Sequence, residues 1–350
     1  MNQAGRKLWK KLPAAALASV FALGAGAASL PFAPSASAEE YAAVSAPNVS
    51  DPAKMELIYL VTASMDSQNR FAQTSDHMEY WALQAAQNQA LAVVANPAPS
   101  SAQLFSARQQ MEKAWGDYAY RYVHDKKDVS RIMGRDGSAI YSKYPSSDPS
   151  YLTPYEKGVI DMIDKTYDLM DTMGDSNGEA AQAYQYYELE TSKLSHLVTP
   201  DFDRYRSSLA YSQEKAAESM VVLEQLGIDA KERVDDFNRS VAFLQALLSN
   251  GPYERAVYSA ALNDVENDRY AIQSSAKLAQ EIVRIQKLAD TSPRGIRSGE
   301  YPASAFGTLN RAINEAKHVL ETADSAEEMN YQYQFVLERA EYYFKKSVKP

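Results

Sequence analysis

The sequence predicts an all-α protein built from two or more bundles of antiparallel amphipathic helices. Apolar residues recur at spacings of three and four, as in the series Val234, Phe237, Val241, Leu244 and Leu248, and such a series lines one face of a helix. No stretch of the chain alternates apolar and polar residues as a half-buried strand does. Capping residues, proline and glycine separate most of the periodic stretches, which indicates helices joined by short turns.

The predicted helices follow one another with recognisable start and stop signals. Thr153 precedes Pro154 and Thr199 precedes Pro200, a pairing typical of a capping residue and the first helical position. Gly227 is placed to end the helix that Pro200 begins. Periodic stretches of this kind predict helices at 51–70, 77–95, 101–124, 154–173, 179–198, 200–226, 230–249, 253–289, 303–322 and 325–346.

One long segment, 128–152, lacks this periodicity and contains Gly134, Gly137, Pro145, Pro149 and several serines. A stretch of this length without regular structure is typical of a domain junction or a functional loop, and we favour the junction. The predicted organisation is a signal peptide at 1–38, an N-terminal helical bundle at 39–127, an irregular linker or loop at 128–152, a central helical region at 153–265 and a C-terminal three-helix module at 266–350.

The first 38 residues have the order of features of a cleavable secretory signal peptide. Four basic residues precede an apolar stretch, Ala14–Leu30, and Ala36-Ser37-Ala38 offers a small-residue cleavage site, so cleavage is expected after Ala38. An uncleaved membrane anchor is the alternative, but glycine and proline interrupt the apolar stretch. The sequence therefore predicts a secreted protein, extracellular or associated with the cell wall, without a transmembrane span in the mature chain.

Composition narrows the classes of partner. The whole chain has 36 basic and 45 acidic residues, and removal of residues 1–38 takes away four basic ones, so the mature chain has 32 basic and 45 acidic residues. This acidic balance argues against a nucleic-acid partner, which requires a basic face, and against simple electrostatic adhesion to anionic lipid or anionic wall polymers. The chain has no cysteine, which excludes disulfides, a cysteine-linked lipid and thiolate chemistry.

An internal repeat is a further prediction. Residues 83–118 align with 309–344 without a gap, and the alignment pairs Leu83 with Leu309 and continues through the turn between two helices. The alternative is chance similarity, because any two alanine-rich amphipathic helices share a period.

The C-terminal part resembles a known kind of module. Gly299-Glu300-Tyr301-Pro302, then Leu309-x-x-Ala312-Ile313-x-x-Ala316, then Leu337-x-x-Ala340 resemble the three-helix modules, "found in various architectures", of extracellular Gram-positive proteins. The segment Thr308–Ile313 is also similar to the C-terminal helical domain of the CAMP factor family of secreted co-haemolysins. The resemblance covers about 270–347 and implies a helical spacer or binding accessory outside the cell. It implies no catalytic residue.

Catalytic and metal-binding motifs are sparse. The four histidines stand on separate predicted helices, and only Glu315-x-x-His318 resembles half of a di-iron helix-bundle site, with no second pair to complete it. Zinc-helix, nucleophile-elbow and phosphate-loop motifs are missing from the sequence. The chain is therefore predicted not to be an enzyme, and no cofactor or metal is expected; the alternative is an enzyme whose site lies in the middle region, for which no resemblance is found.

Two groups of residues are candidates for binding. Carboxylates at Asp161, Asp164, Asp168 and Asp171 share one helical face, and such a face binds cations or basic partners or is simply solvated. The 24 tyrosines are clustered, among them Tyr184 and Tyr187, and also Tyr331, Tyr333, Tyr342 and Tyr343. A helix cannot bury all the members of such clusters, so some rings are expected at the surface or in a groove, where a tyrosine suits a sugar or a partner helix. Packing at the edge of the core is the alternative for these rings.

Two functions are compatible with these features of the sequence. The first is a secreted, non-enzymatic binding or structural protein of the cell exterior, whose partner is a wall polymer, a glycan or another exported protein. The second is a secreted membrane-active protein similar to CAMP factors, against which the acidic charge and the lack of a basic amphipathic face count.

Overall fold

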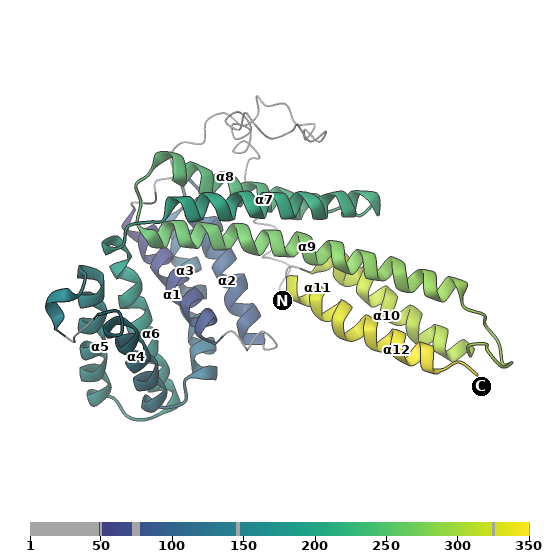
Figure 1. Cartoon of the computed structure of the whole chain (residues 1–350), viewed down its shortest axis with the longest axis horizontal. Coiled ribbons are helices and arrows are strands. Elements are labelled where there is room, and N and C mark those ends of the chain that lie inside the picture. Colours follow the sequence, from purple (N-terminus) through teal and green to yellow (C-terminus); the bar gives the residue numbers. More distant parts are fainter. Residues whose placement is uncertain (1–48, 50, 72–77, 145–147, 324–325, 350) are drawn as a thin grey trace. The chain divides into compact units, whose positions relative to one another are not determined.

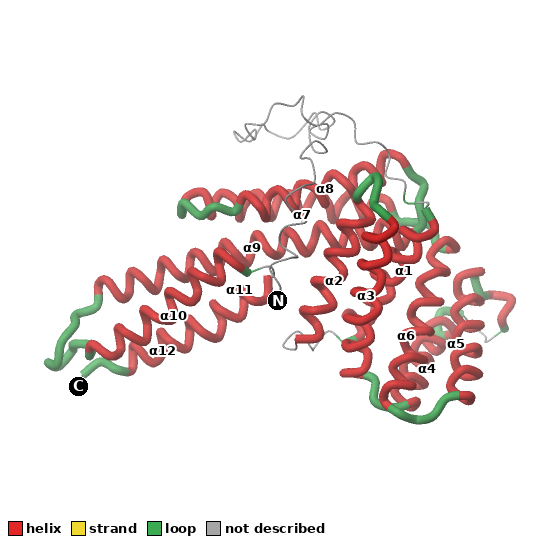
Figure 2. Tube along the Cα trace, turned by 180° about the vertical axis from the view of Figure 1, so that it is seen from behind, coloured by secondary structure: helices red, strands yellow, loops and turns green. Residues whose placement is uncertain are grey.

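Figure 1 shows the computed structural model of the chain, which describes residues 49, 51–71, 78–144, 148–323 and 326–349. The predicted all-α class is confirmed: these residues form helices, and the only extended pairing among them is an isolated bridge between Arg294 and Tyr301 (Figure 2). The predicted signal peptide lies outside the described residues. The chain folds into two compact units, unit 1 and unit 2.

Unit 1 comprises the described residues as far as Asp203, together with Ala242–Asp264. Helix α1 packs against α2, α3 and α6, and α6 also packs against α4 and α5. The core includes Trp115, whose ring is 1% exposed and whose indole N–H donates to Ser67 Oγ at 2.9 Å. Its complete helices are α1 (Pro52–Arg70), α2 (Met78–Ala95), α3 (Ser101–Tyr122), α4 (Lys126–Tyr141), α5 (Pro154–Thr172) and α6 (Asn177–Lys193), with the 3-10 turns η3 (Pro149–Tyr151) and η4 (Leu194–Leu197).

Three helices of unit 1 begin with a capping box, in which the cap side chain and the third helical residue bind each other's backbone N–H groups. The predicted cap Thr153 pairs with Glu156 at the start of α5. Ser176 caps α6 in the same way with Glu179, and Ser100 caps α3 with Gln103. These reciprocal bonds fix the helix starts that the sequence predicts at 101 and 154.

Helix α4 occupies residues that the sequence predicted to be irregular, so the predicted linker 128–152 is wrong over 128–141. The helix forms because Asp125 caps it and because one face is apolar: Val129, Ile132, Met133 and Ile140 are buried. Two glycines in a helix cost about 1 kcal/mol each relative to alanine, and burial of that apolar face outweighs the cost.

One glycine in α4 can be replaced with a gain in stability. A Cβ built on Gly134 has no heavy atom within 4 Å, so Gly134→Ala is expected to raise the free energy of unfolding by about 0.5–1 kcal/mol. Gly158→Ala in α5 is the control, since its Cβ would lie 2.9 Å from Leu194 Cδ1. Urea unfolding followed by tryptophan fluorescence measures both variants, and an unchanged or lower midpoint for Gly134→Ala would contradict the account.

Unit 2 comprises Arg204–Val241 and the chain from Val265 onward. The guanidinium of Arg233 on α8 donates to the carbonyls of Leu320 and Ala323 at the end of α10, at 2.9 and 3.1 Å. Arg269 on α9 stacks against Tyr211 of α7, with the guanidinium 5.5 Å from the ring centroid. The helices that contribute to this unit are α7 (Phe202–Gln225), α8 (Lys231–Asn250), α9 (Arg255–Thr291), α10 (Ala303–Thr322), α11 (Ala326–Tyr331), the π-helix η5 (Gln332–Leu337) and α12 (Glu338–Lys346).

The C-terminal part of unit 2 is a bundle of three helical segments. The second half of α9, then α10, then α11, η5 and α12 lie side by side in both views (Figures 1 and 2). At one end of this bundle Tyr301 stacks on Phe344 with ring centroids 4.4 Å apart, and Phe306 meets Phe344 edge-on. In the part of the chain that the structure describes, no helix has the length and apolar character needed to cross a membrane.

Candidate functional site

The four predicted aspartates lie on α5 and face solvent. Asp161, Asp164, Asp168 and Asp171 are all exposed, and Asp161 pairs with Lys165 one turn later at 2.6 Å. Across the described ranges, no group of three or more histidine, aspartate or glutamate side chains is arranged to hold a metal ion. The geometry of this face is that of a solvated acidic surface, and its predicted binding role stays a prediction.

Tyr184 and Tyr187 lie in the core of unit 1, and neither ring is open to a ligand. Both residues are 0% exposed, because α6 is surrounded by α1, α3, α4 and α5 and turns this face inward. The prediction that Tyr184 and Tyr187 are binding residues is therefore corrected: both rings are buried, whereas the four aspartates are exposed to solvent.

A buried ionic cluster surrounds these tyrosines. The guanidinium of Arg70 on α1 makes two bonds to the carboxylate of Asp136 on α4, at 3.0 and 2.6 Å. Its Nε lies 2.7 Å from Oε1 of Glu188 on α6, and the Tyr187 hydroxyl donates to Asp136 at 2.8 Å. The cluster joins α1, α4 and α6 through these ion pairs and hydrogen bonds, so its role in the fold is to fix the relative positions of the three helices.

Burial sets the protonation of Glu188 in this cluster. Its side chain is 2% exposed, and loss of solvation raises its pKa to about 8. Arg70 acts in the opposite direction, while the negative charges of Asp66 and Asp136 add to the rise. Burial therefore favours the protonated form of Glu188, and the neighbouring guanidinium of Arg70 favours the charged form.

Four exposed aromatic residues lie on the last helical segment of unit 2. Tyr331, Phe335, Tyr342 and Tyr343 are 58, 56, 52 and 55% exposed, and we call them the aromatic face. The rings of Tyr331 and Phe335 are 5.4 Å apart, and those of Tyr342 and Tyr343 are also 5.4 Å apart. Tyr331 and Phe335 therefore form one pair of neighbouring rings, and Tyr342 and Tyr343 form a second pair further along the segment. Exposed apolar groups gathered in this way are typical of interaction sites.

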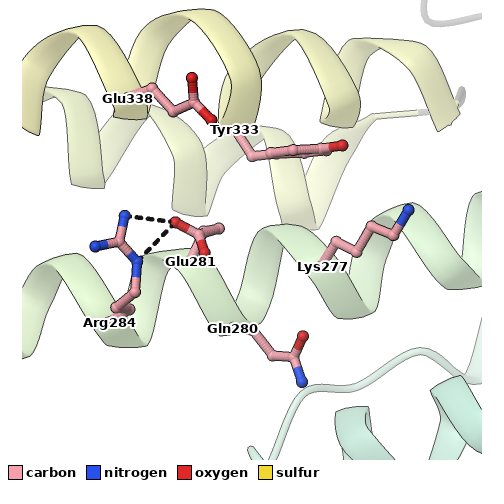
Figure 3. A pocket seen from close by; sticks show the side chains of 6 residues that line it. All are labelled: Lys277, Gln280, Glu281, Arg284, Tyr333 and Glu338. Carbon is pink, nitrogen blue, oxygen red and sulfur yellow. Dashed lines mark hydrogen bonds and ion pairs between the residues drawn. The ribbon is translucent and has the colours of Figure 1, made fainter.

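A polar groove borders the aromatic face. It has a volume of about 310 Å³ and is lined by Lys277, Gln280, Glu281, Arg284, Tyr333 and Glu338. Figure 3 shows Tyr333 and Glu338 on the side of η5 and α12, with the other residues on α9. Glu338 lies between Phe335 and Tyr342 in the sequence, so groove and aromatic face are continuous along the segment.

Arg284 is fully engaged within the groove. Its guanidinium makes two bonds to the Glu341 carboxylate, at 2.7 and 2.6 Å, and donates to Glu281 Oε2 at 2.8 Å. The bonds from Arg284, with a further ion pair from Lys345, lower the pKa of Glu341 to about 2. Arg284 therefore holds α12 against α9 and forms a fixed wall of the groove.

The remaining polar groups of the groove are available to a ligand. Among the described residues, Lys277, Gln280 and Glu338 make no hydrogen bond or ion pair. Together with the half-buried ring of Tyr333 they line the groove with a cation, an amide and a carboxylate, although Gln280 extends away from Tyr333 in Figure 3. An aromatic ring with a few donors and acceptors around it is a usual arrangement for binding a hydroxylated ligand.

Sequence reasoning found part of this site. The tyrosine cluster of the last helix was expected to reach the surface in part, and Tyr331, Tyr342 and Tyr343 do so. Lys277 and Gln280 were not singled out, since their place opposite Tyr333 depends on how α9 packs against α12. Comparison with family models, with curated proteins and with solved structures gave no match, so the resemblance to extracellular three-helix modules stays a prediction.

Proposed function

We propose that this chain is a secreted, non-enzymatic binding protein of the cell exterior that holds a wall glycan with its C-terminal bundle. The observation that carries the proposal is the aromatic face, four rings more than half exposed, next to a groove with three unpaired polar side chains. An acidic, cysteine-free chain with a signal-peptide pattern fits this location.

The chemistry of the surface favours a glycan over other exterior partners. Sugar rings present apolar C–H faces that pack on aromatic rings, and their hydroxyl groups bind amides, carboxylates and ammonium groups. Tyr333 supplies the ring inside the groove, and Gln280, Glu338 and Lys277 supply the polar groups. The aromatic face gives a long glycan further places to stack beyond the groove.

A pull-down with purified Gram-positive peptidoglycan tests the proposal. We expect Phe335→Ala and Tyr333→Ala each to weaken binding about tenfold, which corresponds to about 1.4 kcal/mol. Tyr120→Ala is the matched control, because Tyr120 is 55% exposed but lies on α3 in unit 1. Equal binding by all three variants, or no binding by the unmodified protein, would rule the proposal out.

The alternative, a membrane-active protein similar to CAMP factors, is tested by leakage of dye from liposomes across several lipid compositions. Leakage at low protein concentration would replace the glycan-binding proposal, whereas intact liposomes together with peptidoglycan capture would support it.

A further inference from the structure

One end of the C-terminal bundle is a tip in which two segments are joined by backbone hydrogen bonds. The loop 292–301 folds back on itself through bonds from the Tyr301 N–H to the Pro293 carbonyl, 2.8 Å, and from the Gly295 N–H to the Tyr301 carbonyl, 3.0 Å. The extension after α12 joins it: Gly299 N–H donates to the Lys349 carbonyl and Lys349 N–H to the Glu300 carbonyl, at 3.0 and 2.9 Å. We call residues 292–301 and 345–349 the tip.

The tip is basic in a chain that is acidic overall. The whole chain has a formal net charge of −9, whereas the tip carries five basic side chains, all exposed, and a single acidic one, Glu300. The Glu300 carboxylate is engaged locally, since it accepts from the Arg297 N–H at 2.8 Å. Lys345 is paired with Glu341, but Arg294, Arg297, Lys346 and Lys349 have no carboxylate partner among the described residues.

Apolar side chains project between these basic residues. Ile296 is 88% exposed and stands between Arg294 and Arg297, and Val348, 39% exposed, stands between Lys346 and Lys349. An isoleucine held in water by a hydrogen-bonded loop is an unfavourable arrangement unless another surface covers it. Tyr342 and Tyr343, on α12 just before residue 345, are the exposed rings nearest to the tip in the sequence. Tyrosine is enriched at the level of lipid headgroups.

We propose that the tip docks on the surface of an anionic lipid bilayer, with Ile296 and Val348 in the acyl boundary and the basic side chains among the headgroups. A soluble anionic polymer would be attracted by the same charges, but it would gain nothing from the isoleucine. The bilayer accounts for both features, because apolar insertion and electrostatic attraction add in interfacial binding. The residues that carry this inference, Ile296, Val348 and the basic side chains of the tip, are not part of the glycan site.

Co-sedimentation of the full chain with vesicles tests the inference. We expect binding to vesicles of phosphatidylglycerol and phosphatidylcholine, little binding to phosphatidylcholine alone, and no dye leakage. Ile296→Ser should weaken binding at least about tenfold, as expected from loss of a buried isoleucine side chain. The double variant Arg297→Ala, Lys349→Ala should weaken it about 25-fold, at roughly fivefold for each basic residue.

Val283→Ser is the matched control, since Val283 is 49% exposed on α9 outside the tip, and it should bind as the unmodified protein does. Circular dichroism checks that each variant is folded, which the exposure of the replaced side chains favours. Failure to bind the anionic vesicles would overturn the inference, and so would full binding by Ile296→Ser, which would indicate attraction to charge alone. The Phe335→Ala and Tyr333→Ala variants leave the tip intact, so the glycan proposal can fail without affecting this result.

Discussion

Replacing Arg70 by methionine is expected to lower the free energy of unfolding of unit 1 by about 3 kcal/mol. The change leaves Asp136 without its two charge-assisted bonds and Glu188 without its neighbouring cation, and removal of one partner from a buried ion pair costs about 3–5 kcal/mol. We take the lower end of that range because the side chains of Arg70 and Asp136 are still 23 and 21% exposed, so solvent partly screens their charges. Trp81 and Trp115 both lie in unit 1, so tryptophan fluorescence during urea unfolding reports this unit.

Arg108→Met provides the matched control for this variant. Arg108 also binds two carboxylates, Glu56 and Glu112, but all three side chains are about half exposed. Surface pairs of this kind contribute about 0–1 kcal/mol, so the control should unfold close to the unmodified protein. An equal fall in the free energy of unfolding in the two arginine variants would show that the buried cluster stabilises unit 1 no more than an exposed ion pair does.

The second large effect is a loss of stability as the pH rises. Glu188 has a pKa of about 8 in the folded protein, against 4.5 for the ordinary side chain, because burial disfavours its charged form. Between these values the folded state holds a proton that the unfolded state has released, so the free energy of unfolding falls as the pH rises from 4.5 to 8. The fall amounts to a few kcal/mol, since one pKa unit corresponds to about 1.4 kcal/mol.

Urea unfolding at intervals between pH 4.5 and 9 measures this effect, with Glu188→Gln as the companion variant. Glutamine cannot ionise, so the variant should lose most of the pH dependence and be relatively more stable at pH 8. A pH profile shared by both proteins would place the titrating group elsewhere in the cluster.

The pH dependence that Glu341 in unit 2 contributes has the opposite direction. Its pKa is lowered to about 2, so the stability from its bonds to Arg284 is lost as the pH falls from 4.5 to 2.

The sequence predicted most helices because a single periodic pattern both specifies a helix and marks the face that is buried. Helix α5 is an example: Thr153 and Pro154 predicted its start, and the structure places the capping box there. Helix α4 was missed because Gly134 and Gly137 suggested a loop, although Val129, Ile132 and Met133 already had helical spacing. In this case the burial of one apolar face decided the structure against local propensity.

The candidate site was harder to predict because it depends on which helices become neighbours. Tyr184 and Tyr342 both belong to tyrosine clusters on amphipathic helices, yet one ring is 0% and the other 52% exposed. Helix α6 packs against α1, α3, α4 and α5, whereas the outer residues of α12 stay exposed, and neither fact can be read from local spacing. The groove likewise needs α9 beside η5, a pairing set by the tertiary fold.

The π-helix η5 has a consequence for how the last helical segment is constructed. A π-turn takes up one residue more than an α-turn, so residues after it are out of step with those before it by about 100° relative to an uninterrupted α-helix. With this offset Gln332 and Leu337 before α12 and Phe344 within it all point into the bundle. One extra residue in the turn therefore keeps the buried side chains before and after the π-helix facing the same core.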